Sequence, residues 1–152
     1  MMSVVALLVG AVALAACGDE ANSREAKNAY VRELNAAQVE FATNAETVSQ
    51  QGKAASIGQY RRTLRHFEET IEDFTTKLRG ITVPDVVQEE HEQLIAALTR
   101  FGTDFEKVTS VLNNPNARTL GEAQNAITTA TQQANARIEA AAAAIDSKLK
   151  DA

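Results

Sequence analysis

The chain has 152 residues, of which 45% are hydrophobic and 23% charged, a composition typical of a folded domain rather than a disordered segment. Its formal net charge of −5 excludes the basic field that binds nucleic acid or docks a protein electrostatically on an anionic bilayer. Aromatic residues make up only 5% and tryptophan is absent, so the core must be mainly aliphatic side chains and alanine.

The first feature along the chain is a run of thirteen small or apolar residues from Val4 to Ala16. This run is too short to span the hydrocarbon core of a bilayer, which needs about 20 residues. Its length is instead typical of the apolar region of a secretory signal peptide. We therefore predict that residues 1–16 are a cleaved signal and that the rest of the chain lies outside the cytoplasm.

The signal ends in Leu14-Ala15-Ala16-Cys17, and Gly18 follows. Here the chain resembles bacterial lipoproteins, whose lipobox has a leucine, two small residues and then a cysteine. The resemblance is confined to this N-terminal segment. It implies cleavage before Cys17, a diacylglycerol on the Cys17 sulfur and a fatty acyl group on the new amino group. Residues 17–21 would then be the lipidated cysteine and a short tether, which hold the domain against a membrane of the cell envelope.

The helical domain is predicted over residues 22–152. Asn22 and Glu25 have the spacing of a capping box, which indicates a helix at about 23–49. The apolar stripe of this helix consists of Tyr30, Leu34, Ala37, Phe41 and Val48, with Asn44 at the remaining position. Residues 50–56 break the phase of the repeat, which predicts either a loop or a kink in a continuous helix.

Two heptad runs follow, each with apolar residues at alternating steps of three and four. The first predicts a helix at about 56–79 and consists of Ile57, Tyr60, Leu64, Phe67, Ile71, Phe74, Leu78 and Ile81. The second predicts a helix at about 84–112 and consists of Val87, His91, Leu94, Leu98, Phe101, Phe105, Val108 and Leu112. Between the runs, Gly80 suits a left-handed helix stop and Pro84 suits the first turn of a helix. So short a connection requires an antiparallel pair with facing stripes.

The last helix is predicted at about 119–150. Pro115 cannot continue the preceding helix, and Thr119 with Glu122 forms a second capping box. The stripe of this helix consists of Leu120, Ile127, Ala134 and Ala141, with Ile138 and Ile145 alongside. Because it is rich in alanine, the helix should pack closely but be the least tightly held. The whole pattern predicts an all-α fold, an antiparallel up-down-up-down four-helix bundle with coiled-coil-like heptad packing.

His91 is the candidate polar or functional residue of the core, because it occupies a stripe position whose neighbours in the run are apolar. It could serve as a buried ligand or as a pH-sensing group. The structural alternative is a histidine near the bundle end that is hydrogen-bonded to the turn or to a carboxylate such as Glu90 or Glu92.

A metal site is not expected. Antiparallel pairing about residues 80–83 would place His66 opposite residues near 97, too far from His91 for the two to share one ion. The Glu-x-x-His signature of di-iron bundles also fails, since Thr63 and Gln88 stand where glutamates are needed. We therefore predict no metal and no cofactor apart from the lipid groups on Cys17.

Charged residues on the second helix are expected to pair along its solvated face. Arg65 can meet Glu69, and Asp73 can meet Lys77, each at a spacing of four residues. A partner-docking surface is the functional alternative for this face.

No residue pattern supports catalysis. The chain has no Gly-rich phosphate loop, and its one cysteine is taken by the lipobox. The helical region is loosely similar to small lipoproteins with no assigned activity, through its heptads and the segment from Pro84 to His91. We predict a lipid-anchored, non-catalytic binding or structural module, an adaptor or spacer, with an envelope protein as the possible partner. The alternative is a carrier of a small apolar ligand, in a cavity lined by Phe41, Phe101, Ala134 and Ala141.

Overall fold

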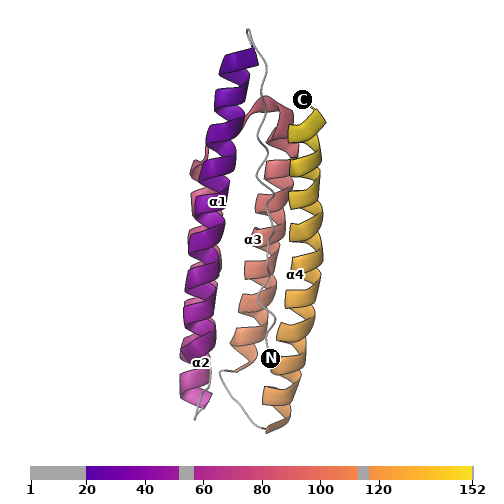
Figure 1. Cartoon of the computed structure of the whole chain (residues 1–152). Helices are drawn as coiled ribbons and strands as arrows, with labels where there is room; N and C mark the ends of the chain where they lie inside the picture. Colours follow the sequence, from indigo (N-terminus) through magenta and orange to yellow (C-terminus); the bar gives the residue numbers. More distant parts are fainter. Residues whose placement is uncertain (1–19, 52–56, 113–116, 152) are drawn as a thin grey trace.

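The computed structural model describes residues 20–51, 57–112 and 117–151, and it places the side chains of residues 24–47, 58–112 and 121–151. It contains four long helices, α1 (Glu20–Gln51), α2 (Ile57–Gly80), α3 (Gln88–Val111) and α4 (Ala117–Asp151), and the 3-10 turn η1 (Asp85–Val87). Each helix packs against the next one in the chain, and all four run along one axis (Figure 1). The predicted all-α four-helix bundle is confirmed.

Two helices begin earlier in the chain than predicted. The helix α1 already begins at Glu20 and α4 at Ala117, so Asn22 and Thr119 lie inside helices rather than at their caps. The residues ahead of each expected cap are good helix formers, and a glutamate in the first turn also favours the helix dipole. The last two residues of the segment predicted as a tether, 17–21, are helical. The loop or kink expected at 50–56 falls mainly on residues 52–56, which lie outside the described residues.

The connection between α2 and α3 also departs from the prediction. Gly80 does not adopt a left-handed conformation, and α2 closes with the Ile81 N–H donating to the Leu78 carbonyl at 3.2 Å. Pro84 then precedes η1 rather than opening α3, and Val87 interrupts the α-helical path with φ −125° and ψ 13°. The side chain of Val87 is fully buried. We attribute the interruption to this burial, which anchors the turn in the core.

The core lies along the predicted stripes wherever their side chains are described. Within the predicted stripe of α1, Asn44 is exposed and Phe41 is half-buried on Phe74, with ring centroids 4.7 Å apart, while the side chain of Val48 lies outside the described ones. The buried apolar residues are Tyr30, Leu34, Ala37, Leu64, Ile71, Phe74, Leu78, Val87, Leu94, Ala97, Leu98, Phe101, Phe105, Leu112, Ala123, Ile127, Ala134, Ile138, Ala141 and Ile145.

The register of α2 against α3 is shifted from the expected one. Phe67 lies beside Phe101 and Phe105, with ring centroids 6.1 and 5.1 Å apart. Its neighbour His66 is therefore at the level of residues 101–105, not of residues near 97. The shift arises because the connection occupies residues 81–87, so that α3 begins later than the pattern indicated. The two histidines are consequently even farther apart than expected.

The helix α4 lies closest to α3, and this pair has the most extensive backbone packing in the bundle. Its buried alanines, Ala123, Ala134 and Ala141, allow that close approach. In the described residues α1 and α4 make no comparable contact, so α1 is held by α2 and by side chains that cross the core. None of the described helices is both long and apolar enough to cross a membrane.

Candidate functional site

The predicted lipidation site, Cys17, lies outside the described residues together with the signal segment. The nearest described residue is Glu20, where α1 begins. The antiparallel topology places the C-terminal ends of α2 and α4 and the start of α3 at the same end of the bundle as Glu20 (Figure 1). We refer to this as the N-terminal end of the bundle.

His91 lies in the core close to this end and is only 3% exposed. Its Nε2 is 3.0 Å from the Leu78 carbonyl oxygen, and its Nδ1 is 3.0 Å from the Tyr30 hydroxyl. A carbonyl can only accept, so Nε2 must carry a hydrogen and donate it. In the neutral ring Nδ1 is then the acceptor, and the Tyr30 hydroxyl donates to it. One histidine thereby joins α1, α2 and α3.

The structural alternative for His91 was a hydrogen bond to the turn or to a carboxylate, and the structure shows the first of these. Leu78 ends α2 beside the turn, as the structural alternative required, but no carboxylate bonds the ring. Glu90 is buried and its Oε1 lies 3.7 Å from Lys148 Nζ of α4, while Glu92 accepts from Gln88. Adjacent residues of a helix do not face each other, so neither glutamate can turn toward the His91 ring.

Tyr30 is the partner that the sequence argument missed. Both Tyr30 and His91 occupy stripe positions near the N-terminal end of the bundle, and this shared level is the signal that could have paired them. Burial raises the pKa of the Tyr30 hydroxyl well above its ordinary value of 10, and the negative charge of Glu90 raises it further. The hydroxyl therefore stays protonated and remains a donor. Both ring nitrogens of His91 are therefore hydrogen-bonded within the core, and we call Tyr30, His91 and the Leu78 carbonyl the His91 clasp because they link three helices.

The second histidine, His66, is exposed, and its Nδ1 lies 3.0 Å from Glu69 Oε2. Within the three described ranges, no group of three or more His, Cys, Asp or Glu side chains is arranged to hold a metal ion. Neither expected ion pair on α2 is present, because Glu69 contacts His66 and Lys77 instead pairs with Glu40 of α1. Exposed pairs differ little in energy, so sequence spacing alone does not select among them.

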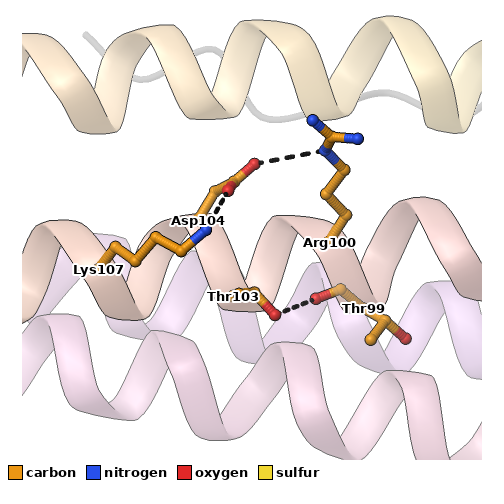
Figure 2. Close-up of polar contacts among 5 residues, drawn as sticks. All are labelled: Thr99, Arg100, Thr103, Asp104 and Lys107. Atoms are coloured by element: carbon orange, nitrogen blue, oxygen red, sulfur yellow. Dashed lines mark hydrogen bonds and ion pairs between the residues drawn. The ribbon is translucent and has the colours of Figure 1, made fainter.

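A groove of about 450 Å³ lies between α2 and α3. We call it the α2–α3 groove, and its lining residues are Glu68, Ile71, Glu72, Thr75, Arg79, Leu98, Thr99, Gly102, Thr103 and Glu106. At one end Arg79 Nη2 donates to Thr99 Oγ1 at 3.2 Å. The Thr103 hydroxyl donates to the Thr99 carbonyl at 3.1 Å (Figure 2). The three glutamates gather toward the other end, which is therefore acidic.

The cavity expected for an apolar ligand is not at this place. Phe101, Ala134 and Ala141 are buried in the core, and Phe41 packs on Phe74. None of these four expected lining residues borders the α2–α3 groove. The groove itself was missed, although Gly102, an isolated glycine inside a helical pattern, was a signal for it.

The chain was also compared with protein-family models, with curated proteins and with solved structures, and no match was found.

Proposed function

We propose that the chain is a lipid-anchored helical bundle outside the cytoplasm, which serves as a non-catalytic adaptor or spacer module at the cell envelope. The observation that carries this proposal is the lipobox Leu14-Ala15-Ala16-Cys17, placed directly ahead of a helical domain whose first helix begins at Glu20. An extended chain covers at most about 3.5 Å per residue, so three residues reach only about 10 Å. Lipid on Cys17 would therefore hold the bundle against the membrane surface.

The buried polar groups of the described interior are hydrogen-bonded within the protein. Each buried threonine of α2 donates to a backbone carbonyl of the preceding turn: Thr63 to Gln59, Thr70 to His66 and Thr75 to Ile71. In the described part of the chain, no buried side-chain nitrogen or oxygen lacks a hydrogen-bond partner.

Metabolic labelling tests the anchor. Cells expressing the full chain are grown with an alkyne-tagged fatty acid, the tag is coupled to a reporter, and the chain is followed through membrane fractionation and mass spectrometry. We expect label and membrane attachment in the wild type and in the control Ser23→Ala, and neither in Cys17→Ser. An unlabelled wild-type chain, or a Cys17→Ser chain that stays with the membrane, would contradict the proposal.

Crosslinking in the same cells distinguishes an adaptor from a spacer. An adaptor should yield one dominant crosslinked protein, identified by mass spectrometry, that is lost when Cys17→Ser frees the chain from the membrane. A spacer should yield no dominant partner although the chain is fully labelled with lipid. The lipid measurement thus tests the anchor independently of the adaptor role.

A further inference from the structure

We propose that the α2–α3 groove docks a basic helix of a protein partner, with lysine or arginine side chains of that helix at the acidic end of the groove. This inference rests on the proposed function, because an adaptor requires a docking face, and it names the chemistry of the partner.

Two carboxylates at the acidic end of the groove lack donors, whereas the third, Glu68, accepts from the Thr109 hydroxyl of α3. Glu72 and Glu106 are exposed, and their carboxylates have no hydrogen-bond or ion-pair partner among the described side chains. The hydroxyl hydrogen of Thr103 is already given to the Thr99 carbonyl, so the oxygen of Thr103 can only accept from a ligand. A lysine ammonium offers three donors and an arginine guanidinium offers five, and neither has an acceptor. These cations complement the acidic end of the groove, whereas an anion does not.

Two cations of α3 are paired with a carboxylate outside the groove. Arg100 Nε and Lys107 Nζ lie 3.8 and 3.3 Å from the two carboxylate oxygens of Asp104. Figure 2 shows these pairs on the edge of α3 that faces the yellow ribbon of α4, away from the bonded Thr99 and Thr103. The Arg79 guanidinium is at the opposite end of the groove, bonded to Thr99. Glu72 and Glu106 are therefore left without an ion-pair partner among the described side chains.

Gly102 keeps the floor of the groove open. A Cβ at this position would meet Ile71 Cγ2 at 3.6 Å, which is an ordinary contact, so packing does not require glycine here. Glycine in a helix interior is nevertheless less stable than alanine by about 0.5–1 kcal/mol. The floor is formed by Gly102 together with the buried side chains of Ile71 and Leu98. The missing side chain leaves room for an apolar side chain of a docked helix.

The shape of the groove favours a helix over a small cation. From Glu68 to Arg79 the groove follows α2 for about three turns, or roughly 16 Å at 1.5 Å per residue. It is bounded by two antiparallel helices, an arrangement that accepts the ridge of a third helix. A small polycation would occupy the acidic end alone. Because Arg79 marks the other end, the docked helix should direct its C-terminal, negative dipole end toward Arg79.

Site-specific photocrosslinking in cells tests this docking. The photoreactive residue p-benzoylphenylalanine replaces Thr103 in the full lipid-anchored chain, and in a matched chain it replaces Gln132, an exposed residue of α4. We expect position 103, but not 132, to capture one protein through a helical segment that carries lysine or arginine. The double variant Glu72→Gln/Glu106→Gln should lower the yield at least about tenfold, since hydrogen bonds to charged groups are lost.

Matched variants separate docking from folding. Glu33→Gln/Glu139→Gln removes the same charge from exposed positions of α1 and α4 and should leave the yield unchanged. Gly102→Leu keeps the charge but fills the floor, and it should reduce the yield as strongly as the double glutamine variant. The helical circular dichroism of every variant is compared with that of the wild type, so that a loss of yield counts only in a folded chain.

Several results would overturn the docking proposal: no capture at position 103, equal capture at 103 and 132, capture of an acidic segment, or a yield that Glu72→Gln/Glu106→Gln leaves intact. Capture from position 132 alone would refute the groove and leave the adaptor role standing. A chain that carries no lipid on Cys17 would instead refute the proposed function, whatever the crosslinks show.

Discussion

Replacing Tyr30 with phenylalanine removes one oxygen from the core and should destabilise the bundle. The Tyr30 hydroxyl is fully buried and donates to His91 Nδ1 at 3.0 Å. In Tyr30→Phe the ring still fills its site, but Nδ1 becomes a buried acceptor without a donor. An orphaned buried polar group costs about 1–3 kcal/mol, so we expect the free energy of unfolding to fall by about that amount.

The partner substitution His91→Leu should also be costly, and the two changes should not be additive. Removal of the imidazole orphans the Tyr30 hydroxyl, whereas the Leu78 carbonyl keeps its bond from the Ile81 N–H at 3.2 Å. The double variant Tyr30→Phe/His91→Leu removes both the Tyr30 hydroxyl and the His91 ring, so neither group is left buried without its partner. It should therefore be more stable than the sum of the single losses by about 1–2 kcal/mol.

Urea unfolding of the unanchored Cys17→Ser chain, followed by helical circular dichroism, measures these free energies. In thermal unfolding, each 1 kcal/mol should lower the Tm by about 2–4 °C for a chain of this size. The control is Tyr60→Phe, because Tyr60 is half-buried and its hydroxyl has no hydrogen-bond partner among the described residues. If Tyr30→Phe cost no more than Tyr60→Phe, or if the two core changes were strictly additive, the His91 clasp would be refuted.

Three further predictions concern stability. Burial raises the pKa of Tyr30 above 10, so the unfolded state loses the hydroxyl proton at a lower pH than the folded state does. The free energy of unfolding should therefore fall as the pH rises past about 10, by up to about 1.4 kcal/mol per pH unit. Circular dichroism would follow the unfolding while tyrosinate absorbance follows the loss of the proton. Unfolding that begins well below pH 10, with tyrosine still protonated, would contradict this. Gly102→Ala should raise the urea midpoint, with a gain of about 0.5–1 kcal/mol, because an added Cβ fits at 3.6 Å from Ile71; a loss of stability would mean that the floor is tighter than described. Leu98→Ala should lower the free energy of unfolding by about 2–5 kcal/mol, since Leu98 is fully buried. Its control is Val39→Ala, a change at an exposed position. Similar urea midpoints for the two variants would contradict the described core.

The helices and their buried faces could be predicted from local sequence patterns. The alternating three- and four-residue steps predicted the core faces of α2 and α3, and every described side chain of those two runs is buried or half-buried. Helix starts were less predictable. Asn22 and Thr119 have side chains that cap helices well, but the residues ahead of them also favour helix, and the helix extended through both.

The sequence alone determined which residues form helices, which faces are apolar and, through short connections, that the helices alternate in direction. These features are encoded within windows of a few turns, where periodicity and propensity act locally. Only the tertiary structure decided that Tyr30 bonds His91, that Lys77 pairs with Glu40, and that Gly102 lies in a groove. Each of these depends on the register between helices, which the buried Val87 and the connection at residues 81–87 shifted. That register decides which residues of neighbouring helices meet, and it cannot be predicted from the spacing of residues within one helix.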